Sequence, residues 1–335
     1  MRRRPGAVLT AALLALAFLA GCSGEPAGPA GGAGTGGPDA STATARPTSP
    51  APAPVPTPTT GGPTTPRPPG PTLAPSTGRT PTGRPTTTGP APDPAPTRRP
   101  VSGARWQPRP GLSWQWQLNG RVDPSVDVPV YDIDGFENGA ADVARLHRDG
   151  RKVICYVNVG AWEDYRPDRD AFPESVLGGP NGWHGERWLD IRRVDVLRPL
   201  MERRFDMCRD KGFDAVEPDL VEGYGNDTGF PLTADDQLRY NRMIADIAHE
   251  RGLAVGLKND LAQIPALVDH FDFAVNEECA QFDECGRLEP FIAAGKAVFH
   301  VEYEEAPSRF CPRSRSLRLS SMLKNPELDV WRKPC

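Results

Sequence analysis

The stretch VLRPLMERRFDMCRDKGFDAVEPDL, residues 196–220, holds the pattern that decides the fold. Its first part carries apolar residues at helical spacing and ends at Gly212, a residue type that commonly closes helices in the left-handed conformation. A short apolar run follows and ends on Glu217 and Asp219. A helix, a glycine, a buried strand and terminal acids in this order predict one repeat of an α/β protein.

The same pattern recurs through the C-terminal part of the chain. Eight β-rich runs cover residues 113–118, 128–133, 152–159, 187–191, 213–219, 253–258, 271–276 and 296–302. Helical patterns lie between them at residues 140–147, 196–209, 235–250, 261–268 and 288–293, and most end at a glycine. This alternation predicts a TIM (β/α)₈ barrel, expected to be irregular near strands 1 and 4, with an open doubly wound sheet as the alternative.

The N-terminus has the organisation of a bacterial export signal. Arginines at positions 2–4 precede an apolar run at residues 7–20, which is shorter than the about 20 residues that a membrane-spanning helix needs. Leu19-Ala20-Gly21-Cys22 follows and resembles a lipobox. We therefore expect residues 1–21 to be a cleaved lipoprotein signal peptide. Cys22 would carry the lipid and tether the protein outside the cytoplasm, at the outer face of the cell membrane.

Residues 22–104 begin with that cysteine and are otherwise dominated by Pro, Thr, Gly, Ala and Ser. Such a composition cannot build a core, so it predicts a disordered, partly extended tether. The folded domain is expected at residues 105–335. The formal net charge of −4 argues against a nucleic-acid partner and permits a cationic one.

Six cysteines remain after Cys22, and disulfides persist in exported domains. Six cysteines allow about 15 pairings. Proximity and element placement favour Cys155 with Cys208, Cys279 with Cys285, and Cys311 with Cys335. Because the chain has no Cys-x-x-Cys pair, we predict no metal, and nothing in the sequence calls for a cofactor.

Acidic residues end most of the predicted strands, where barrel enzymes place their active sites. Side chains two apart share a face of a strand, so Asp219 and Glu277 should converge on the barrel mouth. Two converging carboxylates are the equipment of a glycosidase, which predicts these two as catalytic, with Glu217 and Glu278 as rivals. Lys258 would pair with a carboxylate, with a Schiff-base role as the alternative.

Further polar and aromatic residues lie at or beyond the predicted strand ends and are candidates for substrate binding. Aromatic faces stack on sugar rings and attract ammonium groups. The candidates are Tyr131, Asp132, Asp134, Tyr156, Asn158, Trp162, Glu163, Asp190, Glu217, Tyr224, Lys258, Glu278 and Glu302.

Several motifs together resemble the endo-α-1,4-polygalactosaminidase family, glycoside hydrolase family 114, over residues 105–335. They are WQWQL at 114–118, VYDID at 130–134, CYVNVGAWE at 155–163, EPD at 217–219, VNEEC at 275–279 and MLKN at 322–325. The resemblance implies a TIM-barrel enzyme that cleaves α-1,4-linked galactosamine polymers, with its acidic pair at Asp219 and Glu277. Leu220 departs from the expected pattern, in which Asn follows Glu-Pro-Asp.

The function predicted from these observations is two-carboxylate hydrolysis of a cationic amino-sugar polysaccharide, with retention of anomeric configuration. Two alternatives stay open at this point. The first is a hydrolase of another α-linked glycan, which would keep the acidic pair and change the surrounding pocket. The second is a carbohydrate-binding lipoprotein without activity, which would need neither carboxylate.

Overall fold

The structure is a computed structural model, and it describes residues 105–335. The signal peptide, the lipidated Cys22 and the tether lie outside the described residues and stay predictions. No helix within residues 105–335 is both long and apolar enough to cross a membrane.

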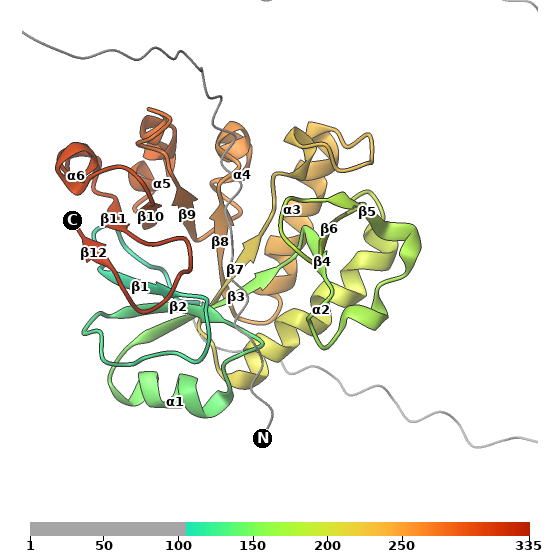
Figure 1. The fold of residues 1–335 in the computed structure, drawn as a ribbon, viewed down its shortest axis with the longest axis horizontal. Coiled ribbons are helices and arrows are strands. Elements are labelled where there is room, and N and C mark those ends of the chain that lie inside the picture. The colour runs from blue at the N-terminus through green and yellow to red at the C-terminus, as the bar shows by residue number, and fades with distance from the viewer. Residues whose placement is uncertain (1–104) are drawn as a thin grey trace, which may run out of the picture. The chain divides into compact units, whose positions relative to one another are not determined.

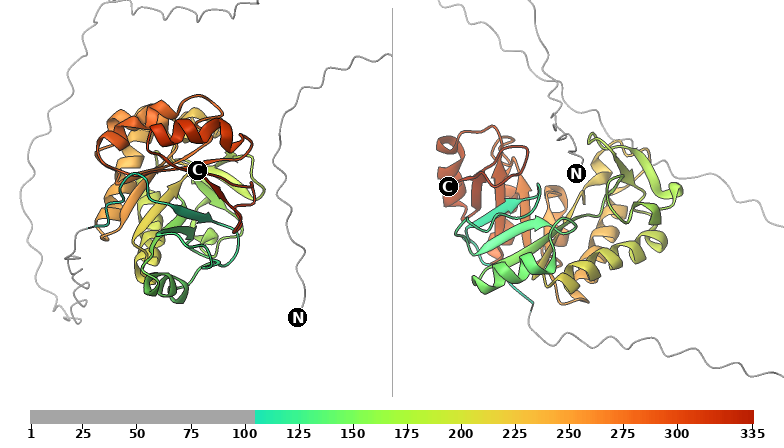
Figure 2. Two further views of the ribbon diagram at one scale, coloured as in Figure 1. Left: turned by 90° about the vertical axis from the view of Figure 1, so that its left-hand side faces the viewer. Right: turned by 60° about the horizontal axis from the view of Figure 1, so that its bottom comes forward.

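Eight parallel strands form a curled sheet with helices on its outer side (Figures 1 and 2). In sheet order they are β1 (Trp114–Gln117), β2 (Val130–Asp134), β3 (Lys152–Asn158), β7 (Ala215–Asp219), β8 (Ala254–Lys258), β9 (Phe273–Glu277), β10 (Val298–Glu302) and β11 (Ser320–Leu323). A ninth strand, β12 (Lys333–Pro334), pairs antiparallel with β11. This arrangement confirms the predicted TIM-barrel fold.

The barrel is irregular in two places. Within residues 105–335 no backbone ladder joins β1 to β11, and the Trp114 indole instead donates to the Ser320 carbonyl at 2.8 Å. The predicted fourth strand is the second irregularity. Residues 187–191 overlap β6 (Glu186–Leu189), which pairs antiparallel with β4 (Ala161–Glu163) and β5 (Leu177–Pro180) in a separate small sheet.

This corrects the strand assignment, because β3 pairs directly with β7 and the eighth barrel strand is β11. Alternating apolar residues predict a strand but do not specify its partner, which explains the error at β6. The pattern missed β11 because two of its four residues are serines.

The helices are α1 (Ala140–Arg148), α2 (Val194–Lys211), α3 (Ala234–His249), α4 (Ile264–Leu267), α5 (Glu289–Ala293) and α6 (Pro307–Ser316). The first five confirm predicted helices, although α4 is shorter than expected. The predicted glycine cap at Gly212 is confirmed by its φ of 90°. The sequence pattern missed α6, which is rich in arginine and contains Pro312.

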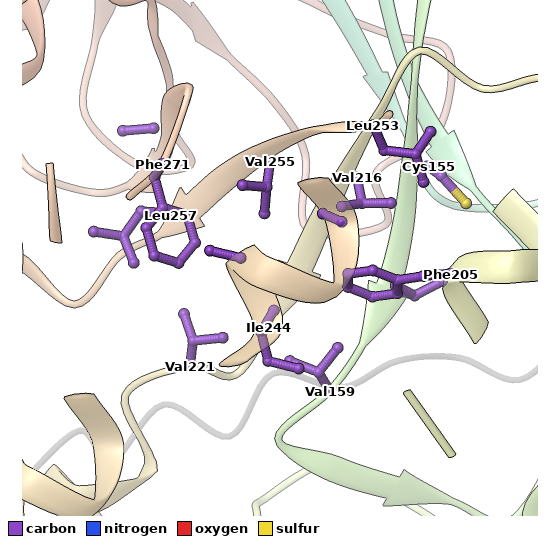
Figure 3. Close-up of a cluster of buried hydrophobic side chains, with 14 of the residues drawn as sticks. Cys155, Val159, Phe205, Val216, Val221, Ile244, Leu253, Val255, Leu257 and Phe271 are labelled. Carbon is purple, nitrogen blue, oxygen red and sulfur yellow. The ribbon is translucent and has the colours of Figure 1, made fainter. Parts of the chain in front are cut away.

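Apolar side chains fill both sides of the sheet. Outward-facing residues such as Cys155, Val216 and Val255 pack against Phe205 of α2 and Ile244 of α3 (Figure 3). A second buried cluster fills the barrel interior and includes Trp114, Ile154, Ala215, Phe273 and Phe299. Because Ala215 faces the interior and Val216 faces outward, Glu217 and Asp219 also face the interior, as strand alternation predicts.

The structure confirms the three favoured disulfides, Cys155–Cys208, Cys279–Cys285 and Cys311–Cys335. The first joins β3 to α2, and the third joins α6 to the C-terminal residue. Cys279 and Cys285 lie with His300 at a spacing that could hold a metal ion, but the two sulfurs are bonded to each other.

Candidate active site

A cavity of about 1140 Å³ opens at the carboxyl ends of the barrel strands. Its lining comes from the ends of β1, β2, β3, β7, β8 and β9 and from loops beyond the barrel strands. Eleven acidic side chains line it, against three basic ones, Arg166, Lys258 and Arg287. Such an excess of carboxylates creates a negative potential and attracts cationic ligands.

Lys258 lies at the centre of the site and is only 3% exposed. Its Nζ lies 2.8 Å from Oδ1 of Asp219, 3.0 Å from Oε2 of Glu277 and 3.7 Å from Oε1 of Glu217. Burial lowers the pKa of the Lys258 ammonium, but these carboxylates outweigh burial and hold it well above its ordinary value. Lys258 is therefore a fixed positive charge between the two predicted catalytic acids.

Asp219 is held in its ionised form. Burial would raise the pKa of Asp219, but the Lys258 ammonium and hydrogen bonds from the Tyr156 hydroxyl and the Leu220 amide lower it below its ordinary value. The Tyr156 hydroxyl donates to Oδ2 at 2.7 Å, and the Leu220 amide donates to Oδ1 at 2.9 Å. A carboxylate held ionised by a cation and by hydrogen bonds is suited to act as a nucleophile.

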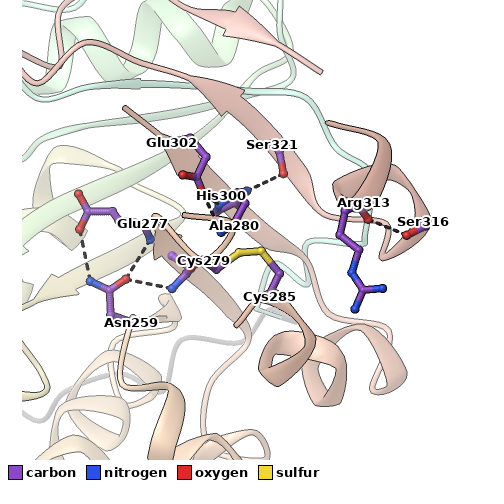
Figure 4. The surroundings of a disulfide bond; sticks show 11 residues. Asn259, Glu277, Cys279, Ala280, Cys285, His300, Glu302, Arg313, Ser316 and Ser321 are labelled. Atoms are coloured by element: carbon purple, nitrogen blue, oxygen red, sulfur yellow. Dashed lines mark hydrogen bonds and ion pairs between the residues drawn. A yellow bond between two sulfur atoms is a disulfide. The ribbon is translucent and has the colours of Figure 1, made fainter. Parts of the chain in front are cut away.

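Glu277 ends β9 and is oriented by its neighbours. The Tyr303 hydroxyl donates to Oε1 at 2.5 Å, and the Asn259 amide group donates to Oε2 at 3.3 Å. Oδ1 of Asn259 also accepts from the Glu277 backbone amide at 3.0 Å (Figure 4). The Asn259 side chain therefore holds both the backbone and the carboxyl of Glu277.

The first residue after each of three neighbouring strands has a left-handed backbone conformation. Leu220, Asn259 and Glu278 have φ values of 59°, 49° and 60°. Left-handed backbone is uncommon for residues other than glycine and tends to occur at functional sites. At β7 the geometry also relies on Gly160, because a Cβ there would meet the Leu220 carbonyl oxygen at 1.8 Å.

A second pair of acids lies beneath the cavity. Asp132 and Glu217 are both fully buried, and the Trp116 indole donates to Oε2 of Glu217 at 3.0 Å. Within residues 105–335 no group donates a hydrogen bond to either oxygen of Asp132, and its side chain faces the Glu217 carboxyl. Burial raises the pKa of Glu217 to about 7 and that of Asp132 well above its ordinary value. The pair therefore shares at least one proton.

Two more carboxyl groups at the cavity are shifted toward the neutral form. Burial, with a smaller effect from Asp219, raises the pKa of Glu222 to about 8. Burial also raises the pKa of Asp260 to about 7, against hydrogen bonds from Tyr224 and Asn241. Oε2 of Glu222 is buried and has no hydrogen-bond partner among residues 105–335. These groups can exchange protons near neutral pH.

The structure brings part of the predicted site together. Both predicted catalytic acids line the cavity. So do five of the predicted binding residues, Asp134, Tyr156, Tyr224, Lys258 and Glu278. Among these, Oδ2 of Asp134 forms an ion pair with Arg166 at 2.7 Å. Asp134 therefore supports the cavity wall and is less available to a ligand.

Eight predicted binding residues lie outside the cavity lining. Tyr131 faces outward from β2, and its hydroxyl donates to the Val126 carbonyl at 2.6 Å. The others are buried or bonded to protein groups. They are Asp132 and Glu217 below the cavity, Asn158 capping the loop after β3, Trp162 bonded to Arg169, Glu163 paired with Arg166, Asp190 paired with Arg192, and Glu302 bonded to His300.

Loop residues account for most of what sequence reasoning missed. Glu222 and Asp260 lie two or three residues beyond strand ends, and Tyr165, Trp183 and Phe282 lie further along. A search for acids and aromatics within three residues of each strand end would have found Glu222 and Asp260. No local pattern marks the three aromatics, because the conformation of their loops decides where they lie.

Comparison with known proteins agrees with this geometry. The model of glycoside-hydrolase family GH114 matches residues 95–335. The crystal structure of Aspergillus fumigatus Ega3 in complex with galactosamine is 41% identical, with a TM-score of 0.66, and the match covers 70% of this chain and 99% of Ega3. No match was found among curated protein sequences.

The glycoside hydrolase domain of PelA from Pseudomonas aeruginosa is 16% identical, with a TM-score of 0.53 over 66% of this chain and 97% of that domain, and it shares the fold. The family match covers the whole of the barrel described above. This chain therefore belongs to glycoside-hydrolase family GH114 and is a glycosidase.

Proposed function

We propose that the protein is a retaining hydrolase of α-1,4-linked galactosamine polymers, in which Asp219 is the nucleophile and Glu277 the general acid and base. One observation carries the proposal. A single buried ammonium, that of Lys258, contacts both carboxylates at the end of the barrel. Few structural roles need two acids and one lysine in contact at the centre of an acidic cavity, whereas a glycosidase needs its two acids on either side of the scissile bond.

Retention is proposed from the closeness of the two carboxylates to one ammonium. Because Lys258 Nζ lies 2.8 Å from one carboxylate and 3.0 Å from the other, the nearest oxygens of Asp219 and Glu277 can be no further apart than the sum of these distances. Retaining enzymes separate their carboxyl groups by about 5 to 5.5 Å, and inverting enzymes by about 6.5 to 9.5 Å.

The proposed first step cleaves the glycosidic bond. Asp219 attacks the anomeric carbon while protonated Glu277 donates its proton to the departing oxygen, which leaves as a sugar hydroxyl. Glu277 becomes a carboxylate as this happens. Lys258 and the Tyr303 hydroxyl already contact it, so they stabilise the charge that develops.

The second step releases the covalently bound sugar. Glu277 accepts a proton from water, and the resulting hydroxide attacks the anomeric carbon and displaces Asp219. The site then returns to its starting state, with Asp219 ionised and Glu277 protonated. Two displacements at the same carbon give a product of unchanged anomeric configuration.

The substrate class is proposed from charge and from the Ega3 comparison. Galactosamine units are cations at neutral pH, and the cavity lining carries eleven acids against three bases. Ega3, which is 41% identical, was crystallised with galactosamine. The enzyme would act outside the cytoplasm, held to the membrane through Cys22.

A substrate panel tests this proposal. The full-length protein should cleave a de-N-acetylated α-1,4-galactosamine polymer, giving shorter oligomers with the parent anomeric configuration. Added salt should raise KM for this polymer by screening its ammonium groups. Rapid cleavage of a neutral α-glucan, with the galactosamine polymer left intact, would refute the substrate assignment and leave another α-linked glycan as the substrate.

A further inference from the structure

Phe282 is a large aromatic side chain that the fold holds in solvent at the cavity. It is 62% exposed and lines the cavity together with Glu278 and Glu284. A single exposed aromatic is common on protein surfaces and by itself indicates nothing. The ring can serve as a binding surface only if the backbone around Phe282 holds it at the cavity.

The backbone of the 278–285 loop is fixed by several contacts. The Cys279–Cys285 disulfide closes the loop, and both sulfurs are buried. Inside it, the Phe282 amide donates to the Glu278 carbonyl at 3.2 Å, and the Glu284 amide donates to the Cys279 carbonyl at 2.8 Å. Glu278 and Asp283 adopt left-handed backbone, with φ values of 60° and 53°.

A buried polar group beneath the loop attaches it to the barrel. The Ala280 amide donates to Oε1 of Glu302 at 2.8 Å, and the same carboxylate contacts Nε2 of His300 (Figure 4). His300 contacts Ser321 of β11 through its other nitrogen at 2.8 Å. The loop is therefore held at its ends by a disulfide and at its middle by the barrel wall.

We propose that the 278–285 loop presents Phe282 as a stacking surface for an amino-sugar unit on the leaving-group side of the cleavage point. Glu278 would bind the ammonium group of that unit, next to Glu284, which pairs with Arg287 at 3.3 Å. The inference rests on the proposed function and adds to it a binding subsite beyond the catalytic pair.

The side of the cleavage point follows from the chain path. A general acid faces the leaving oxygen, so the leaving sugar must lie against Glu277. The chain runs from Glu277 directly into this loop, and Phe282 follows five residues later. A rigid ring in this place binds a sugar face without the entropy loss of ordering a flexible loop.

The test compares two substrates that differ in their need for this subsite. A galactosamine polymer occupies it, whereas α-galactosaminyl fluoride, whose leaving group is a single atom, leaves it empty. Phe282→Ala should lower kcat/KM for the polymer by about five- to tenfold, in line with a cation–π or stacking contact. The same variant should hydrolyse the fluoride at the parent rate, and Phe282→Trp should restore cleavage of the polymer.

Trp331→Ala provides the matched control, since Trp331 is 45% exposed and does not line the cavity. This variant should match the parent on both substrates. Unchanged polymer cleavage by Phe282→Ala, or an equal loss on both substrates, would overturn the subsite while leaving the proposed function intact. A parent protein inactive on the polymer would overturn both.

Discussion

Lys258 is the residue on which the electrostatics of the site depend. Its ammonium lowers the pKa of Asp219, which burial would otherwise raise. It also contacts Glu277 and Glu217, so three acids share one cation. A cation in this place holds the nucleophile ionised and stabilises the charge that forms when the general acid loses its proton.

Replacing Lys258 should therefore move the pH dependence of the reaction. In Lys258→Met the pKa of Asp219 loses its main lowering influence and rises, so the acidic limb of kcat/KM should shift upward by about one to three pH units. Lys258→Arg keeps the charge and should shift the limb less. The measurement is a pH–rate profile on variants shown to be folded by thermal melting. An unmoved acidic limb in Lys258→Met would mean that Lys258 does not set the ionisation of the nucleophile.

Glu222 should make stability depend on pH. Its pKa rises from 4.5 to about 8 on folding, chiefly because of burial. The folded state binds this proton more tightly, so the stability it contributes is complete below about pH 4.5 and is lost as the pH rises toward 8. Glu222→Gln removes the buried charge. We expect this variant to melt at a higher temperature than the parent at pH 8 and at nearly the same temperature at pH 4.5.

The exposed Glu289 offers the control, and Glu289→Gln should leave the difference between the two pH values as it is in the parent. A Glu222→Gln variant no more stable than the parent at pH 8 would show that solvent reaches this carboxyl in the folded protein.

At the scale of elements, the sequence predicts strands whose two faces are both buried. It does not predict the conformation of the loops between them. Strand alternation places Glu217 and Asp219 on the inner face, and the structure agrees. The same alternation, applied to β2, turns Tyr131 to the outer face, where it packs in the cluster between sheet and helices. Phe282 could not be placed, because the left-handed residue at 278 sets the direction of its loop.

The order of the strands also needed more than local patterns. Residues 187–191 form a strand, but its partners are β4 and β5 of the small sheet. β3 pairs directly with β7, although β4, β5 and β6 lie between them in the sequence. Only long-range contacts decide such a choice, and a single sequence does not display them.

The disulfide between β3 and α2 should be the main covalent support of the barrel wall. Cys155 and Cys208 are 53 residues apart in sequence, whereas Cys311 and Cys335 are 24 apart. Loop-closure entropy predicts a loss of about 4 kcal/mol in unfolding free energy for Cys155→Ala with Cys208→Ala, and of about 3.5 kcal/mol for the other pair. Guanidinium unfolding of the two double variants measures both values. A loss below about 1 kcal/mol for the β3–α2 pair would contradict a stabilising role.

For the whole molecule, the predicted N-terminal lipid sets where the enzyme works. Residues 1–104 lie outside the described part of the chain, and the expectation rests on the order of charged, apolar and small residues before Cys22. Cys22→Ala should move the protein from the membrane fraction to the soluble fraction without changing its activity on dissolved polymer. Membrane fractionation followed by immunoblotting measures this. A variant that stays in the membrane fraction would contradict the lipid anchor at Cys22.

The central claim is that Asp219 and Glu277 carry out the chemistry, and their different roles allow a direct test. Each single change to alanine should lower polymer cleavage by about 10² to 10⁴-fold in a folded protein. The leaving group separates the two roles, because an activated aryl α-galactosaminide needs no proton from Glu277.

The decisive measurement is therefore the rate of aryl-group release by both variants. We expect Glu277→Ala to release the aryl group in a fast first turnover and Asp219→Ala to stay slow with every leaving group. Polymer cleavage at the parent rate by both folded variants would contradict the account and make Glu217 and Glu278 the pair to test.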